Sequence, residues 1–273
     1  MKNIEFKPFT HTDGFVTAYL HTPLPLDDRI TPSDYSYPSI IICPGGGYEF
    51  VSAREADPVA LEYLSAGYNV FILTYSVGEK AKDFVPLMEL SQTVMTIREH
   101  ADEWGCIPSK IAVCGFSAGG HLACSLSTLW NHPELLKRMN TDNGKNRPNA
   151  AILSYPVILA NEYAHEGSIT RVSGSPKGSG DYLFFSLDKQ VSIDTCETFL
   201  WHTANDTCVP VENSLYFALA LQEHKIPYEC HIYPEGTHGL SVCTNETRSE
   251  HDHNRQWVEA SKKWLNNLFH NKL

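Results

Sequence analysis

The chain has 273 residues, of which 42% are hydrophobic and 19% are charged, and its formal net charge is −11. This length and composition suit a large core, so we expect residues 1–273 to form a single α/β domain. A strongly negative surface repels nucleic acid and anionic lipid, and neither is expected as a partner.

The composition also indicates a cellular setting. No apolar run reaches the roughly 18 residues of a membrane span, and residues 1–7 lack the apolar core of a signal peptide, so we expect a cytoplasmic location. The eight cysteines form no C-x-x-C pair and several lie in apolar stretches, which favours reduced, buried thiols. The oligomeric state stays open, with a homo-oligomer among the alternatives.

The amino-terminal half alternates between strand and helix patterns. Strands are predicted at 3–9, 14–22, 39–43, 68–75 and 111–114, helices at 57–66, 86–104 and 118–130, and a proline-rich loop at 23–38. An apolar strand that alternates with amphipathic helices is typical of a mostly parallel sheet covered on both faces.

The carboxy-terminal half continues the alternation around one long insertion. A polar loop is predicted at 131–149, strands at 150–159, 198–203 and 228–233, and helices at 211–224 and 249–269. Residues 160–194 are predicted to be irregular. They follow a strand on the side where active sites collect, so we interpret them as a lid or substrate-binding cap, with an inert surface loop as the alternative.

A G-x-S-x-G motif joins a predicted buried strand to a predicted helix. This is the context of a nucleophile elbow, in which a strained turn exposes a serine hydroxyl. Gly115 and Gly119 remove β-carbons that would collide where strand and helix cross. Ser117 is therefore the candidate nucleophile, and the N–H of Ala118 at the helix start is a candidate oxyanion donor. The alternative is a glycine-rich turn with an incidental serine.

A second glycine-rich loop, Pro44-Gly45-Gly46-Gly47-Tyr48, follows the strand at 39–43. In serine hydrolases such a loop supplies oxyanion donors, as the HGGG motif does. Pro44 stands where that motif has histidine, so only the donor role is transferred, to the amides of Gly46 or Gly47. A phosphate-cradling loop or a plain turn is the alternative, and a Walker loop is excluded because no Gly-Lys-Ser/Thr follows.

Ser117, Asp206 and His238 occur in the order Ser–Asp–His, and each comes directly after a predicted strand. That order is the order of α/β-hydrolases, and parallel strands end at a common edge where the three side chains can meet. Asp194 is the alternative acid, but it precedes its strand. The competing histidines lie inside predicted helix or strand; they are His121, His202 and His231.

Five segments, in matching order over nearly the whole chain, resemble the α/β-hydrolase esterases known as acetylxylan esterases or xylanase-associated acetyl esterases, the BD-FAE-like group. These segments are PGGGY at 44–48, GFSAGGHLA at 115–123, WHTAND at 201–206, VPVENS at 209–214 and GTHG at 236–239. The resemblance implies an α/β-hydrolase fold with a mostly parallel central sheet, helices on both faces and a small lid insertion.

The resemblance also implies a serine carboxylesterase that removes acetyl groups from xylo-oligosaccharides or related sugars. Ser117 would attack the ester carbonyl, His238 would take its proton, and Asp206 would orient the imidazole. This two-step acyl transfer needs no metal and no cofactor. The expected partner is a small-molecule ester such as an acetylated oligosaccharide.

Aromatic residues near the motifs are candidates for a small acyl pocket and a sugar platform; they are Tyr48, Phe50, Phe116 and Trp130. Aromatic side chains in such positions are more often part of the core, so both interpretations stay open. His251-Asp252-His253 could suggest a metal ligand set, but it lies in a charged run at a helix start and is expected to be solvated.

Two other functions fit the same fold. A small amidase similar to arylformamidases would use the same three residues on an amide. A non-catalytic binding protein would be expected to lack a member of the Ser–His–Asp set, and all three residues are present.

Overall fold

The computed structural model describes residues 1–22 and 35–270. These residues form an eight-stranded sheet in the order β1-β2-β4-β3-β5-β6-β7-β8. β1 (Lys2–Phe6) and β2 (Phe15–Leu20) form a leading antiparallel hairpin, and β2 pairs antiparallel with β4 (Asn69–Thr74). From β4 to the far edge of the sheet, each strand runs parallel to its neighbour. The strands that follow β4 in the sheet are β3 (Tyr37–Cys43), β5 (Cys106–Phe116), β6 (Ala150–Ser154), β7 (Thr198–Thr203) and β8 (Tyr228–Tyr233).

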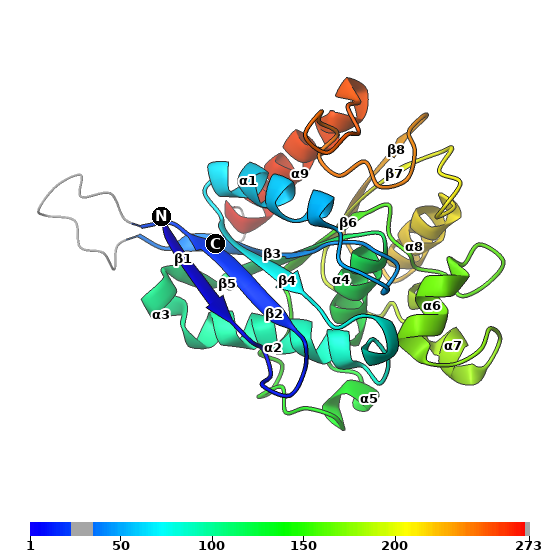
Figure 1. Cartoon of the computed structure of the whole chain (residues 1–273), viewed down its shortest axis with the longest axis horizontal. Helices are drawn as coiled ribbons and strands as arrows, with labels where there is room; N and C mark the ends of the chain where they lie inside the picture. Colours follow the sequence, from blue (N-terminus) through cyan, green and yellow to red (C-terminus); the bar gives the residue numbers. More distant parts are fainter. Residues whose placement is uncertain (23–34, 271–273) are drawn as a thin grey trace, which may run out of the picture.

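Helices cover both faces of this sheet, as Figure 1 shows. On one face lie α1 (Asp57–Ser65) and α9 (Asp252–His270), and on the other lie α2 (Val85–Glu99), α4 (Ala118–Leu129) and α8 (Glu212–Glu223). Consecutive residues of β3 alternate between the two cores, with Ile40 and Ile42 in one and Ile41 in the other. The sheet is buried on both sides, which confirms the predicted α/β class.

Several bounds in the first half differ from the prediction by a few residues, and β1 ends at Phe6 where a strand to residue 9 is predicted. The helix predicted at 86–104 is divided into α2 and α3 (Ala101–Trp104), because His100 has φ −101° and ψ 18° and leaves the helical region. β5 begins at Cys106 instead of residue 111, because Cys106 pairs with Tyr37 beyond a register shift in β3. Local patterns do not reveal such pairing.

Two further predictions need correction. The strand predicted at 150–159 ends at Ser154, because the next residue, Tyr155, takes a positive φ of 36° and turns out of the sheet. Of the loop predicted at 23–38, residues 23–34 lie outside the described residues, and Tyr37 and Pro38 belong to β3.

The segments predicted to be irregular contain short helices. α5 (Pro133–Leu136) lies within 131–149, and α6 (Glu166–Ser173) and α7 (Gly180–Phe184) lie within 160–194. Helices of four to eight residues are too short to show a clear periodicity. Figure 1 places α6 and α7 at the end of the molecule toward which the β4 arrow points.

The eight cysteines are all free thiols, as predicted. Six are buried, but Cys208 is exposed and Cys230 is half-buried, so the prediction of burial is wrong for Cys208. Cys208 lies in the loop that follows β7, where its thiol does not pack into the core.

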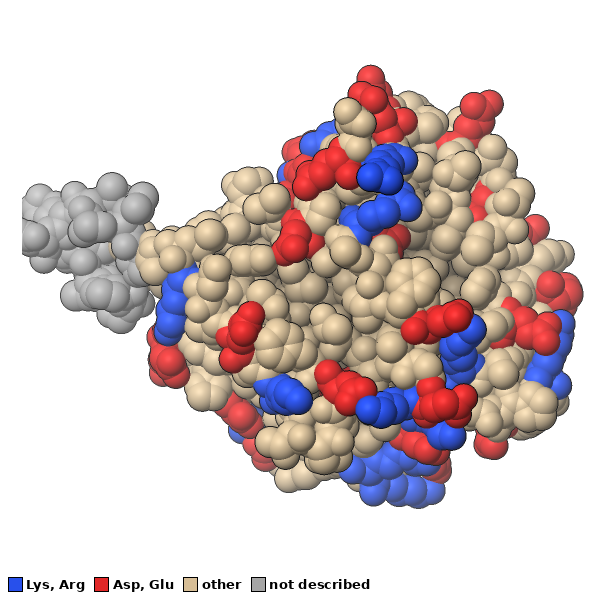
Figure 2. Space-filling view, viewed as in Figure 1, with Lys and Arg blue, Asp and Glu red and all other residues tan. Residues whose placement is uncertain are grey.

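Charged groups are mixed on the surface. Figure 2 shows lysine and arginine side chains interspersed with aspartate and glutamate on one face of the molecule, in a chain whose net charge is −11. Within residues 1–22 and 35–270, no helix combines the length and apolar character that crossing a bilayer requires.

Candidate active site

Ser117 lies in a strained turn between β5 and α4. Its backbone has φ 54° and ψ −118°, a combination that non-glycine residues rarely adopt. A β-carbon on Gly115 would lie 2.1 Å from the carbonyl oxygen of Gly119, and a β-carbon on Gly119 would lie 2.0 Å from that of Cys43. The two glycines therefore permit the close crossing of strand and helix, as the sequence predicts.

Three side chains from three strand ends are joined by two hydrogen bonds. Nε2 of His238 lies 2.8 Å from Oγ of Ser117, and Nδ1 of His238 lies 2.6 Å from Oδ2 of Asp206. An ionised carboxylate only accepts hydrogen bonds, so Nδ1 carries the proton and Nε2 accepts from the serine hydroxyl. The structure thus brings together the three residues that the chain order singled out.

The Asp206 carboxylate is fully buried and held from several sides. Its Oδ1 accepts from the N–H groups of Cys208 and Val209 at 2.9 and 3.0 Å, and Nε2 of His202 lies 3.4 Å from Oδ2. Burial by itself would raise the pKa of Asp206, but the contacts from His202 and His238 outweigh it and hold that pKa well below its usual range. The group is therefore ionised at neutral pH and able to orient His238.

The glycine loop lies beside the serine. A β-carbon on Gly45 would lie 3.0 Å from Cβ of Ser117, and the next two glycines, Gly46 and Gly47, have φ values of 127° and 66°. Within the described part of the chain, the N–H groups of Gly46, Gly47 and Ala118 have no hydrogen-bond partner. These amides are available to an anionic oxygen that forms next to the serine hydroxyl.

The two aromatic candidates nearest to the motifs belong to the core. Tyr48 is fully buried, and its hydroxyl lies 2.9 Å from Nδ1 of His121. Phe116 is also fully buried, with its ring 5.8 Å from those of Tyr155 and Trp257. Neither side chain has an exposed surface to offer a sugar, which corrects the interpretation of both as substrate-binding residues.

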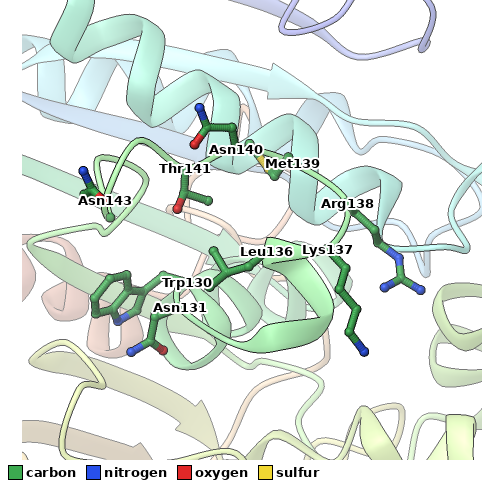
Figure 3. Close-up of a pocket in the computed structure, with 10 residues that line it drawn as sticks. Trp130, Asn131, Leu136, Lys137, Arg138, Met139, Asn140, Thr141 and Asn143 are labelled. Atoms are coloured by element: carbon green, nitrogen blue, oxygen red, sulfur yellow. The ribbon is translucent and has the colours of Figure 1, made fainter.

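Trp130 lies far from the serine. It follows the twelve residues of α4, which span about 18 Å, whereas Ser117 precedes them. Its indole N–H donates to the carbonyl oxygen of Asp194 at 3.0 Å, and the Arg147 guanidinium lies 5.1 Å from the ring centre. Trp130 lines a separate hollow of about 600 Å³ together with residues of the 131–149 segment. Figure 3 shows Trp130 beside Asn131, Leu136 and Thr141 at this hollow. Its assignment to the substrate site is therefore wrong.

The alternative acid and bases have other partners. The Asp194 carboxylate accepts from Asn131 at 2.9 Å, and His231 pairs with Glu229 at 2.7 Å. His121 is held by Tyr48 and by the carbonyl oxygen of Phe185 at 3.1 Å, and burial lowers its pKa to about 4. Within the described residues, none of these three side chains has a hydrogen bond to the Ser117 hydroxyl.

The inserted segment contributes a histidine that sequence reasoning missed. His165 lies next to the glycine loop, since its Cε1 would be 3.9 Å from a β-carbon on Gly47, and its Nδ1 lies 2.8 Å from Oγ of Ser168. Burial lowers the pKa of His165, and the nearby Arg171 guanidinium lowers it further. A single histidine in an irregular segment carries no spacing signal that could have indicated this position.

Two buried residues next to the site were also missed. The ring of Tyr155 lies 5.0 Å from that of His238 at an interplanar angle of 69°. The hydroxyl of Tyr155 donates at 2.7 Å to Glu55, whose carboxylate is buried behind the glycine loop. Nothing in their local sequence distinguishes them from ordinary core or loop residues.

The described residues contain no group of three or more His, Cys, Asp or Glu side chains arranged to hold a metal ion. The His251-Asp252-His253 run lies at the start of α9, as expected, and residues 252 and 253 are exposed.

A family model described as BD-FAE matches residues 30–221. Among curated proteins, the chain is 35% identical over 241 residues to endo-1,4-beta-xylanase B of Butyrivibrio fibrisolvens. This match covers 85% of this chain and 36% of the xylanase. It is 29% identical over 222 residues to an acetylxylan esterase of Xylanibacter ruminicola, and this match covers 78% of this chain and 43% of that esterase. The matched region is thus less than half the length of either curated relative.

Two solved structures resemble the chain over almost its whole length. An acetyl ester-xyloside bifunctional hydrolase from Caldicellulosiruptor lactoaceticus has a TM-score of 0.79 and 34% identity, covering 96% of this chain and 91% of that one. A carboxylesterase from Lactobacillus plantarum has a TM-score of 0.83 and 26% identity, covering 98% of both. The fold is that of the α/β hydrolases, as the sequence resemblance implies.

The crossing at Gly119 gives a test of the elbow geometry. We expect Gly119→Ala to lower the free energy of unfolding by about 3 kcal/mol or more, because the new methyl group would meet the backbone carbonyls of Cys43 and Pro44. Urea unfolding followed by circular dichroism measures the change. Gly180→Ala is the control, since Gly180 also lies in the first turn of a helix and has open space around it. Equal effects of the two substitutions would contradict the strained crossing.

Proposed function

The chain belongs to the BD-FAE family, and from that membership we propose that its natural reaction is the removal of acetyl groups from xylo-oligosaccharides or related acetylated sugars. It is an enzyme, a carboxylic ester hydrolase of the acetylxylan esterase type. The identity of the acyl group, of the alcohol and of the catalytic residues is the content of the proposal.

The pair of hydrogen bonds through His238 carries the proposed mechanism. Nε2 of His238, 2.8 Å from Oγ of Ser117, takes the hydroxyl proton as the oxygen attacks the ester carbonyl. Asp206, 2.6 Å from Nδ1, keeps the imidazole in the required tautomer and stabilises its protonated form. The alkoxide leaving group then takes the proton from His238, and an acyl-serine remains.

Water completes the reaction by the same route. His238 takes a proton from water as its oxygen attacks the acyl-serine carbonyl, and returns the proton to Ser117 when the acid departs. In both steps the N–H groups of Ala118 and of Gly46 or Gly47 bind the tetrahedral oxyanion. Each donor of this kind is worth about 2.7–4 kcal/mol in the transition state.

The proposed substrate rests on relatives rather than on the shape of the site. One curated relative is an acetylxylan esterase, and one solved relative is an acetyl ester-xyloside bifunctional hydrolase. The imidazole of His238 is 19% exposed, so an ester can reach the reacting atoms from solvent. These observations support a small acyl group on a carbohydrate alcohol.

We propose further that the chain acts as one domain in which residues 160–194 cover the site as a lid. Three contacts support this role. His165 lies beside Gly47, the Arg171 guanidinium pairs with Glu49 at 2.6 Å, and the carbonyl oxygen of Phe185 lies 3.1 Å from His121. The first two tie α6 to the glycine loop, so a bound alcohol would lie between Ser117 and the lid.

Replacement of the nucleophile tests the proposal directly. We expect Ser117→Ala to reduce kcat for para-nitrophenyl acetate by about 10⁴-fold or more, because the acyl-enzyme can no longer form. Initial rates by absorbance measure the change, and acetylated xylo-oligosaccharides and an aryl acetamide complete the substrate panel. Ser125→Ala, which removes another serine hydroxyl on α4, is the control and should leave kcat unchanged.

Three outcomes would overturn the proposal in different ways. Equal rates for wild type and Ser117→Ala would remove Ser117 as the nucleophile. Faster turnover of the amide than of the ester would favour the amidase alternative. Absence of turnover on every substrate would favour a binding protein.

Replacement of His165 tests the lid. Nε2 of His165 has no hydrogen-bond partner among residues 1–22 and 35–270 and can form one hydrogen bond to a sugar hydroxyl. His165→Ala should therefore raise KM for an acetylated xylo-oligosaccharide up to about tenfold. The KM for para-nitrophenyl acetate, which has no hydroxyl groups, should stay the same. His224→Ala, at the residue that follows the C-terminal end of α8, is the control and should change neither value. An equal rise of KM for both substrates, or no rise for either, would argue against a sugar-binding role.

A further inference from the structure

A short segment after the glycine loop reaches the loops that carry the proposed catalytic groups. This segment is the 3₁₀ turn η2 (Ala53–Glu55), and its two charged residues, Arg54 and Glu55, face different neighbours. Glu55 contacts the glycine loop and the loop after β6. Arg54 contacts the loop that contains His238.

Glu55 connects the glycine loop to Tyr155. Its Oε2 accepts from the N–H of Gly45 at 2.7 Å, and its Oε1 accepts from the hydroxyl of Tyr155 at 2.7 Å. Gly45 immediately precedes the proposed oxyanion donors, and a β-carbon on it would lie 3.0 Å from Cβ of Ser117. The Glu55 carboxylate therefore holds the glycine loop in place next to Ser117.

Tyr155 connects Glu55 to the proposed base. Its ring packs at 5.0 Å against the ring of His238, and its hydroxyl also accepts from the N–H of Ser241 at 2.8 Å. Burial, followed by the charge of Glu55, raises the pKa of Tyr155 well above its ordinary value, so the hydroxyl stays protonated and donates. Tyr155 also has a positive φ of 36°, a conformation that non-glycine residues rarely adopt.

Arg54 binds the loop after β8, which contains His238 and is called the His238 loop below. Its Nη2 donates to the carbonyl oxygen of Gly239 at 2.7 Å, and its Nε donates to that of Thr247 at 2.8 Å. In return, the hydroxyl of Ser241 donates to the carbonyl oxygen of Arg54 at 2.6 Å. The backbone directly after His238 is thus bound to the segment that follows the glycine loop.

Glu55 is a buried carboxylate whose two hydrogen-bond donors are both neutral groups. Its exposed fraction is 4%, and no lysine, arginine or histidine forms an ion pair with it in the described residues. A buried carboxylate without a cation is costly, and an apolar side chain of similar size would be less so.

We propose that Arg54 and Glu55 are positioning residues that hold the glycine loop and His238 in one fixed relation to Ser117. The inference rests on the proposed function, because it assigns no new reaction. Neither residue touches the substrate. Glu55 acts through Gly45 and Tyr155, and Arg54 acts through Gly239.

The expected loss of rate follows from how small a displacement a catalytic site tolerates. A displacement of about 1 Å in a catalytic group can reduce the rate by about a hundredfold. Such a displacement would weaken the stabilisation of the transition state, in which the oxyanion amides and His238 must act together. It would leave the binding of the ester unchanged. The expected signature is a lower kcat at an unchanged KM.

Glu55→Gln is the first test, because it keeps the shape of the side chain. The amide has one acceptor oxygen where two are needed, so either the Gly45 N–H or the Tyr155 hydroxyl loses its partner. We expect kcat for para-nitrophenyl acetate to fall about 10- to 100-fold with KM within about twofold of wild type. Affinity for an aryl trifluoromethyl ketone, which forms a tetrahedral adduct with the serine, should fall in parallel with kcat.

Glu89→Gln is the matched control. Glu89 is a fully buried carboxylate that accepts from the N–H groups of Gly14 and Ser76 and from the Ser76 hydroxyl at 2.6–2.9 Å. It has no contact with the proposed catalytic residues. Its substitution should lower the melting temperature but leave kcat per folded enzyme and inhibitor affinity unchanged.

Tyr155→Phe gives a second, independent variant in case Glu55→Gln does not fold. It removes the hydroxyl but keeps the ring against His238, and it should lower kcat without changing KM. Because the two residues share the hydrogen bond between the Tyr155 hydroxyl and Oε1 of Glu55, the double variant should lose less than the product of the two single losses.

The inference fails if folded Glu55→Gln and Tyr155→Phe keep the kcat and inhibitor affinity of wild type. It also fails if Glu89→Gln loses as much kcat as Glu55→Gln, or if the losses of the double variant multiply. These outcomes are distinct from failure of the proposed function, in which wild type itself would not hydrolyse the ester.

Discussion

The hydrogen bond between Nε2 of His238 and Oγ of Ser117 is the contact on which the site depends. It joins residues 121 positions apart at 2.8 Å, and it exists because β5 and β8 of a parallel sheet end at the same edge. The buried Asp206 carboxylate fixes the donor and acceptor roles of the imidazole. A serine hydroxyl is therefore paired with a base whose free nitrogen can accept its proton.

Backbone constraints around this bond are as restrictive as the side-chain contacts. Ser117 occupies a rarely populated conformation, and Gly115 and Gly119 leave room for the close crossing of strand and helix around it. The glycine loop passes the same serine with two amides unoccupied. In our proposal, Glu55 and Arg54 keep that loop and the His238 loop together, so that binding of the oxyanion and proton transfer occur in one geometry.

The sequence predicts what depends on local pattern and chain order. The strand–elbow–helix motif located Ser117, and the position of Asp206 and His238 after strands predicted their meeting. Residue type near a motif was a poor guide to exposure, because Tyr48 and Phe116 turn into the core and Trp130 lies at the far end of a helix. Glu55, Tyr155 and His165 reach the site through tertiary packing, for which a single sequence has no periodic signal. The same holds for the short helices of the 160–194 segment.

The most direct measurement is to capture the acyl-enzyme. Wild-type protein mixed with excess para-nitrophenyl acetate is quenched in acid within the first turnovers, digested, and examined by mass spectrometry. We predict a single acetyl group on the peptide that contains Ser117, and on Ser117 itself after fragmentation. Turnover without any acetylated peptide, or with the acetyl group on another residue, would contradict a mechanism in which this serine is the nucleophile.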